Sequence, residues 1–181
     1  MTKVLGIDPG TGSFDICGLK DGRIFYENSI NTDELLENPN LLIEATEEAM
    51  PLDLITGPSG YGVELTYLED LDIDTLKEWY LTYILLLKEN DLEEALKEGN
   101  PGISVYSVMT ETAKEMKRRN WPVCYIPGVL NLPTVPEWRK INKLDLGTVD
   151  KLCSALLGIQ DQAKRLDIPY SETSFILVEL G

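Results

Sequence analysis

The sequence contains no histidine among its 181 residues. This absence excludes catalytic triads with a histidine base and metal centres with imidazole ligands. Cysteine is scarce as well: Cys17, Cys124 and Cys153 lie far apart in the chain. An odd number of cysteines without a C-x-x-C spacing argues against a disulfide framework or a zinc site. We therefore expect three reduced cysteines that serve as packing residues in a cytoplasmic protein.

Positive charge is also in short supply, with 16 Lys and Arg against 31 Asp and Glu and a net charge of −15. Such a surface repels phosphate backbones and anionic lipids, which counts against general nucleic-acid or membrane binding. A single nucleotide is not excluded, because backbone N–H groups can bind phosphates without Lys or Arg. The most apolar run, 79–87, has about half the length of a membrane span and predicts a buried helix. The run 4–7 is too short for a secretory signal.

Short apolar runs separated by turn residues predict that the chain opens as three antiparallel strands. Asp21-Gly22 is a strong hairpin signal between the second and third of them. The six strands that we expect cover residues 3–8, 13–19, 23–30, 52–56, 123–126 and 175–178.

Helical signals follow the third strand. Asn31-Thr32-Asp33 can cap a helix that runs to about Met50, with an interruption near Pro39. A long loop with three prolines is expected at 127–146. The apolar residues between Val149 and Leu166 recur at helical spacing and predict one apolar face. The other expected helices cover residues 74–98, 101–119 and the stretch from about Thr148.

Three antiparallel strands followed by α/β units is the order of the ribonuclease-H-like fold. Two such domains in tandem make the actin-like ATPase fold. We therefore predict an α/β domain of this kind over residues 1–173, with a helical insertion at about 63–119. Residues 174–181 are expected to be the first strand of a truncated second domain.

The turn after the first strand is the leading candidate for a phosphate site. Its glycines allow the backbone to approach phosphate oxygens, and its N–H groups and hydroxyls can donate to them. A carboxylate at the end of the strand can hold Mg²⁺ directly or through water. The same residues also suit an ordinary hairpin turn. The residues concerned are Asp8, Gly10, Thr11, Gly12 and Ser13.

The pattern Glu179-x-Gly181 follows an apolar stretch, as Asp8-x-Gly10 does near the start. Actin-like ATPases and kinases have two phosphate turns that face each other across a cleft. Glu179 and Gly181 are therefore predicted to belong to the second turn. The alternative is a strand with no ligand.

Three segments, Gly6–Ser13, Ile55–Gly62 and Leu144–Lys151, together resemble an archaeal family described as predicted butyrate kinases. That family belongs to the acetate and sugar kinase, heat-shock ATPase and actin superfamily. The resemblance implies ATP and Mg²⁺ as cofactors and phosphoryl transfer to a small acceptor, such as a carboxylate, in an inter-domain cleft. Members are longer than this chain, which implies a missing C-terminal half. A homodimer is a further expected arrangement.

Four more residues are candidates for the substrate side. Asp145 precedes the last expected helix and could act as a base or orient a substrate. Arg139 could bind a carboxylate or phosphate with two hydrogen bonds. Ser59 and Tyr61 lie in a glycine-rich loop after a strand, where open α/β sheets hold ligands. Each has a purely structural alternative as a loop, surface or helix-cap residue.

Two other functions compete with a kinase. Gly6–Gly10 also looks like the opening of a Holliday-junction resolvase, a nuclease with the ribonuclease-H-like fold. Two-metal hydrolysis needs several carboxylates, and Thr56-Gly57-Pro58 supplies none where the next is expected. An actin-like regulator or scaffold would use the same phosphate turns as a conformational switch, so the sequence leaves that alternative open.

Overall fold

The computed structural model describes residues 1–88 and 101–178. The chain opens with three antiparallel strands, as predicted: β1 (Lys3–Pro9), β2 (Ser13–Lys20) and β3 (Arg23–Asn31). Asp21 and Gly22 join β2 to β3 with φ angles of 48° and 78°. A tight hairpin turn requires this left-handed backbone, which glycine and aspartate tolerate.

Two short helices follow the meander. Asn31 is the N-cap of α1 (Thr32–Glu37), and its side chain accepts a hydrogen bond from the backbone N–H of Asp33 at 2.8 Å. Pro39 separates α1 from α2 (Asn40–Glu48), because its ring cannot fit inside a continuous helix. The predicted cap and the predicted interruption are both confirmed.

The strands form one mixed six-stranded sheet in the order β3-β2-β1-β4-β6-β5. β4 (Leu54–Thr56) lies parallel to β1, and β6 (Val123–Tyr125) lies parallel to β4. The connection between these parallel strands contains α5 (Pro101–Arg118), while β5 (Thr66–Tyr67) adds an antiparallel edge. The predicted α/β class is confirmed: three antiparallel strands precede the α/β units, as in a ribonuclease-H-like domain.

The helix expected at 74–98 is shorter than predicted. After η1 (Leu68–Asp70), the described helical residues are α3 (Leu76–Trp79) and the π-helical turn η2 (Tyr80–Ile84). Residues 85–88 are irregular, because Leu86 has a φ of 56° that no right-handed helix accommodates. Residues 89–98 of the expected helix lie outside the described residues. How much of 63–119 is an insertion stays a prediction.

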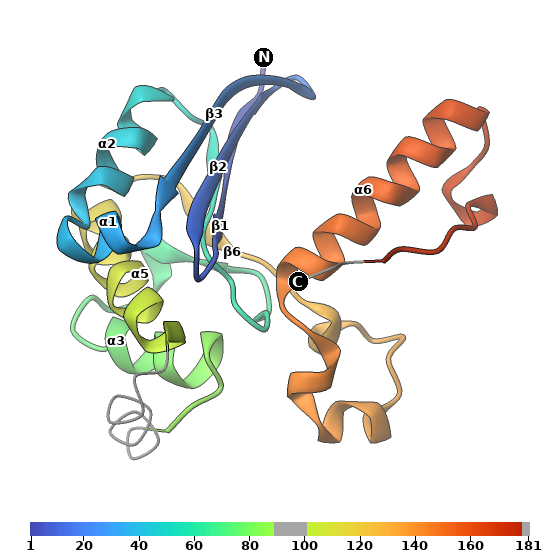
Figure 1. Ribbon diagram of the computed structural model, residues 1–181. Helices are drawn as coiled ribbons and strands as arrows, with labels where there is room; N and C mark the ends of the chain where they lie inside the picture. Colours follow the sequence, from blue (N-terminus) through green and yellow to red (C-terminus); the bar gives the residue numbers. More distant parts are fainter. Residues whose placement is uncertain (89–100, 179–181) are drawn as a thin grey trace.

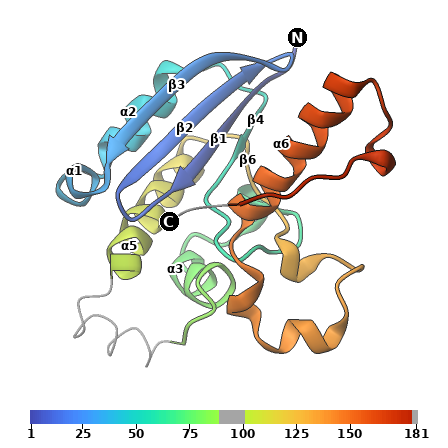
Figure 2. The ribbon, with the colours of Figure 1, turned by 45° about the vertical axis from the view of Figure 1, so that its right-hand side comes forward.

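Three helices cover one face of the sheet. α1, α2 and α5 lie together on that face, and α5 contacts both of the others (Figure 1 and Figure 2). Alternate residues of the strands point into this layer because side chains in a strand alternate between its two faces. The largest buried side chains of the core include Leu5, Phe14, Leu35, Leu42, Ile55, Tyr80 and Tyr125.

The predicted loop 127–146 contains short 3-10 turns rather than an α-helix or strand. It leads into α6 (Val149–Leu166). No helix in the described part of the chain is long and apolar enough to cross a membrane. The turns of the loop are η3 (Val129–Asn131), η4 (Glu137–Ile141) and η5 (Lys143–Leu146).

The apolar face predicted for α6 is only partly covered by the described residues. Val149 and Ala163 are buried, but Leu156 and Leu166 are 55% and 56% exposed. The reason is that α6 leaves the sheet near its first turn and extends away from it (Figure 1). Periodicity correctly predicts the helix, and the structure covers only part of its apolar face.

The strand expected at 175–178 is not formed. After η6 (Tyr170–Glu172), residues 173–178 have no regular secondary structure and run back along α6 (Figure 1 and Figure 2). The side chain of Gln162 holds them by donating to the carbonyl of Ser174 at 2.9 Å and accepting from its N–H at 2.6 Å. A strand needs a hydrogen-bonding neighbour, and no described strand pairs with this segment. Assignment of 174–181 to a second domain stays a prediction.

Candidate functional site

The face of the sheet opposite α1, α2 and α5 carries polar side chains in register. Antiparallel pairing of β1, β2 and β3 places every second residue of each strand beside its partners on this face. β4 continues the second row through its parallel pairing with β1. The two rows are Asp8, Asp15 and Ser29, and Thr56, Gly6, Cys17 and Glu27.

A cleft of about 1040 Å³ lies between this polar face and the start of α6. Strands, the loop after β4 and the first turns of α6 all contribute to its lining. Its size is at the upper end of the range of small-molecule sites, roughly 300–1,000 Å³. The residues that bear on the chemistry are Asp8, Gly10, Asp15, Cys17, Glu27, Ser59, Thr148, Asp150, Lys151 and Cys153.

The turn between β1 and β2 brings part of the predicted phosphate site into the cleft. Asp8 and Gly10 line it, whereas Thr11, Gly12 and Ser13 do not. The N–H of Gly10 donates to the carbonyl of Ser13 at 2.8 Å and closes the turn. That N–H is therefore used within the turn, and the role of the remaining turn residues in phosphate binding stays a prediction.

The glycine-rich loop after β4 places Ser59 at the cleft, whereas Tyr61 does not line it. Ser59 is 5% exposed, and its hydroxyl donates to the carbonyl of Gly57 and accepts from the N–H of Ile126. Gly60 lines the cleft with a φ of 52°. This loop is thus a structural part of the cleft wall, and a substrate role for Tyr61 stays untested.

The N-terminus of α6 supplies the opposite wall. Asp150 accepts a hydrogen bond from the hydroxyl of Thr148, and its Oδ2 lies 2.5 Å from the Nζ of Lys151. Partial burial raises the pKa of the Asp150 carboxyl, but the hydrogen bonds from Lys151 and Thr148 outweigh this effect and lower the pKa overall. Asp150 therefore stays ionised at neutral pH.

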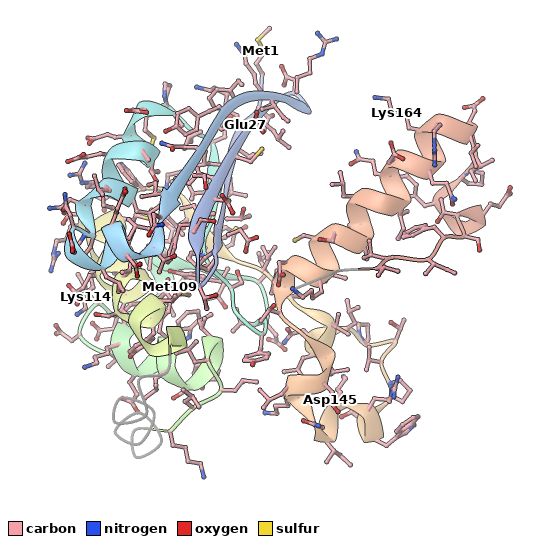
Figure 3. All side chains as sticks on the ribbon, in the orientation of Figure 1. Met1, Glu27, Met109, Lys114, Asp145 and Lys164 are labelled. Carbon is pink, nitrogen blue, oxygen red and sulfur yellow. The ribbon has the colours of Figure 1, made fainter. Side chains whose placement is uncertain are left out.

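Asp145 and Arg139 are not brought to the cleft. Asp145 is exposed in η5, on the loop away from the sheet (Figure 3). Arg139 is exposed in η4, and its guanidinium lies 5.3 Å from the ring centroid of Trp138. Glu179 and Gly181 lie outside the described residues, so the pairing of two phosphate turns stays a prediction.

Residues 6–181 match the model of the family described as a protein of unknown function, DUF1464. The chain belongs to this DUF1464 family. None of the curated proteins compared with it matches.

Solved structures resemble the DUF1464 chain over part of their length. The PPX-GPPA enzyme of Aquifex aeolicus is 16% identical over 68% of this chain and 52% of its own, with a TM-score of 0.42. Acetate kinase from Entamoeba histolytica is 13% identical over 77% and 40%, with a TM-score of 0.37. A propionate kinase from Francisella tularensis is 9% identical over 76% and 40%, with a TM-score of 0.35.

The DUF1464 chain thus spans about half or less of the length of these structures. At such identities and TM-scores the likeness carries no argument about activity.

Sequence reasoning missed several residues of the cleft in the DUF1464 chain. The signal for Asp15 and Glu27 was the alternation of β2 and β3, which places them on the same face as Asp8. Asp150 could have been found as an acidic residue in the first turn of the last helix, a preferred position for carboxylates. Cys17 and Cys153 also line the cleft, so of the three cysteines only Cys124 is a buried packing residue.

The donor set of the cleft fits Mg²⁺ bound together with a nucleotide. No group of three or more Cys, Asp or Glu side chains within residues 1–88 and 101–178 could hold a metal ion. Mg²⁺ at nucleotide sites needs less, because one or two carboxylates suffice when water and phosphate oxygens complete its shell. Asp8 offers such a carboxylate. The lining carboxylates Asp8, Asp15, Glu27 and Asp150 outnumber the single lining cation, Lys151, so a polyphosphate needs a metal counter-ion here.

Proposed function

We propose that this chain is the N-terminal domain of an ATP-dependent phosphotransferase and lines its Mg-ATP cleft. One observation carries the proposal: Asp8 and Gly10 of the first turn and Asp150 at the start of α6 line the same cleft. These groups come from opposite walls and are more than 130 residues apart in the sequence. A phosphate-accepting turn facing a carboxylate is an arrangement that suits phosphoryl transfer, where positioning and charge stabilisation dominate catalysis.

Asp8 is the residue that would hold Mg²⁺, either directly or through its waters. Bound Mg²⁺ would neutralise charge that develops on the transferred phosphoryl group. The backbone around Gly10 would contact the phosphates, since the missing side chain allows close approach. Thr11, Gly12 and Ser13 belong to the same proposed contact, together with Glu179 and Gly181 from the other half of the cleft.

We assign the role of base or orienting carboxylate to Asp150 rather than to Asp145. Asp150 lines the cleft, and its lowered pKa keeps it charged at neutral pH. A base must lie within reach of the acceptor's proton, and the exposed Asp145 lies on a loop outside the lining. Lys151, paired with Asp150, is placed to attract a phosphate or to hold Asp150 in place.

A small carboxylate is the acceptor that the sequence resemblance implies. The geometry gives that part limited support, because Arg139, the predicted carboxylate-binding residue, lies outside the cleft lining. Acceptor tests should therefore include both carboxylates and hydroxyl compounds. A C-terminal half that closes the cleft, and a homodimer, are proposed as partners. The three free cysteines support a reducing compartment such as the cytoplasm.

The decisive experiment measures Mg-ATP turnover of the complete protein with Asp8→Asn, an isosteric change that removes the charge. Turnover should fall at least about a hundredfold, as loss of a main electrostatic contact at a reacting centre does. Asp70→Asn is the matched control, because Asp70 is exposed in η1 and does not line the cleft. Undiminished turnover in Asp8→Asn would overturn the proposal.

A second comparison separates the roles of the two carboxylates and of the acceptor. Asp150→Asn should lower kcat more than Asp145→Asn does. ADP release is then measured with acetate, butyrate, glycerol or no acceptor. Equal release in all four would contradict phosphoryl transfer to a small molecule and favour an actin-like ATPase that works as a switch.

A further inference from the structure

The buried hydroxyl of Ser59 lies at the junction of two strand ends. It donates to the carbonyl of Gly57, just after β4, at 2.9 Å. It also accepts from the N–H of Ile126, just after β6, at 3.0 Å. A hydroxyl has one proton to donate, so the donor capacity of Ser59 is already used within the protein. The side chain therefore ties the loop after β4 to the end of the neighbouring strand.

The next residue links this loop to α6. The carbonyl of Gly60 accepts a hydrogen bond of 2.8 Å from the N–H of Val149, the first residue of the helix. Such N–H groups have no partner inside their own helix, so an external acceptor fixes the helix start. Val149 is also 93% buried, with 7% of its surface exposed. The first turn of α6 is thus held by the loop that Ser59 anchors.

The loop itself has little room to move. A Cβ atom on Gly60 would lie 2.2 Å from the carbonyl oxygen of Ile84, and one on Gly62 would lie 2.1 Å from the N of Gly128. Both glycines have positive φ angles, 52° and 98°. The loop therefore packs tightly against the segments at Ile84 and Gly128. Because it cannot shift easily, its position fixes the position of the first turn of α6.

We propose that Ser59 is a positioning residue that sets Asp150 of α6 against Asp8 of β1 across the cleft. The chain of contacts runs from β4, which is paired with β1, through Ser59 and Gly60 to Val149, the residue before Asp150. Ser59 acts through these contacts and not by binding a substrate. The expected effect of Ser59 on kcat rests on the proposed phosphotransferase function. Its expected effect on the position of α6 does not.

The kinetic test compares Ser59→Ala with the unaltered complete protein. Loss of the anchor should lower kcat for Mg-ATP turnover about ten- to a hundredfold, because small displacements of a reacting group have effects of that size. The KM values for ATP and acceptor should stay unchanged. A raised KM with an unchanged kcat would instead identify Ser59 as a substrate contact and overturn the proposal.

A second readout needs no enzyme activity. Cys153 lies one turn after Asp150 and lines the cleft. Burial raises the pKa of its thiol, and the carboxylates of Asp150 and Asp8 raise it further. Because the thiolate is the reactive form, iodoacetamide should alkylate Cys153 slowly in the unaltered protein. Release of the helix start in Ser59→Ala should speed this alkylation severalfold, as measured by peptide mass spectrometry.

Two further variants make the outcome decisive. Val149→Pro removes the N–H that donates to Gly60, and proline is well tolerated at the first position of a helix. It should reproduce the faster alkylation of Cys153 even if Ser59→Ala does not fold. Thr46→Val is the matched control, since it deletes a fully buried hydroxyl that bonds to Leu42 within α2 on the other face.

Thr46→Val should lower stability without changing Cys153 alkylation or kcat. Equal alkylation rates in Ser59→Ala, Val149→Pro and the unaltered protein would overturn the positioning role. That result is distinguishable from failure of the proposed function, in which the unaltered protein shows no turnover while the alkylation rates still differ.

Discussion

The two faces of the sheet are built from alternate residues of the same strands, yet they differ in what covers them. On β2, Phe14 and Ile16 are 0% and 2% exposed beneath the helical layer. Their neighbours Asp15 and Cys17 line the cleft on the opposite face. The helices α1, α2 and α5 cover the packed face, whereas α6 extends away from the sheet (Figure 1). Residues that stabilise the fold therefore alternate along β2 with residues that line the cleft, and the two kinds can be substituted separately.

The largest expected effect is on the packed face. Phe14→Ala should lower the free energy of unfolding by about 3–5 kcal/mol, because it removes a fully buried ring and leaves a cavity. Urea unfolding followed by circular dichroism measures the change. The midpoint should shift to lower urea with little change in slope.

The paired substitution on the cleft face is Asp15→Asn. Asp15 is exposed and accepts a hydrogen bond of 3.2 Å from the hydroxyl of Ser13, so stability should change by no more than about 0.5 kcal/mol. A loss of unfolding free energy as large as that in Phe14→Ala would show that the cleft face contributes to stability as much as the packed face does.

The packed face also buries polar groups, and their hydrogen bonds contribute to its stability. The hydroxyl of Tyr80 donates to that of Tyr125 at 2.7 Å, and both rings are fully buried. Tyr80→Phe should lower the free energy of unfolding by about 1–3 kcal/mol, because it leaves the buried hydroxyl of Tyr125 without this hydrogen-bond partner. The double variant Tyr80→Phe/Tyr125→Phe should cost less than the sum of the single changes. Strict additivity in urea unfolding would mean that the two hydroxyls are not coupled.

A smaller effect of opposite sign is expected at Thr112 on α5. Its hydroxyl is buried and has no hydrogen-bond partner among the described residues. It lies beside a cavity of about 10 Å³, which is at the lower limit for a water molecule. Thr112→Val should therefore raise the thermal midpoint by removing an unpaired polar group, a gain of about 1 kcal/mol. A lowered midpoint would indicate that a buried water pairs with this hydroxyl.

The features that the sequence predicted most accurately are those that a few neighbouring residues determine. Asp21-Gly22, the cap at Asn31 and the break at Pro39 all depend on a few consecutive residues, and the structure has each of them. The three antiparallel strands at the start of the chain were predicted as well. These features need no knowledge of what lies across the molecule.

What the sequence did not predict depends on distant partners. Among the described residues, the segment 175–178 has no neighbouring strand, and the apolar face of α6 is only partly covered. Within the site, Asp145 and Asp150 are both acidic residues near the start of α6, and only the fold determines that Asp150 lines the cleft. Ser59 lines the cleft as expected for the substrate side, but its link between two strand ends was not predicted, and a contact with substrate stays a prediction.

The smallest expected effect concerns the pH dependence of Asp150 on the cleft face. Its pKa is lowered in the folded protein, so the stability it contributes is present above the unfolded value of about 3.9 and is lost as pH falls through the folded pKa. The contribution should be at most about 1 kcal/mol, because the side chains of Asp150 and Lys151 are 30% and 42% exposed. Urea unfolding of the unaltered protein and of Asp150→Asn should therefore differ slightly at pH 7, and the difference should shrink below about pH 4. A difference that grows as the pH falls would mean that the carboxyl is stabilised in its protonated form, which would remove the ionised carboxylate from the wall of the cleft.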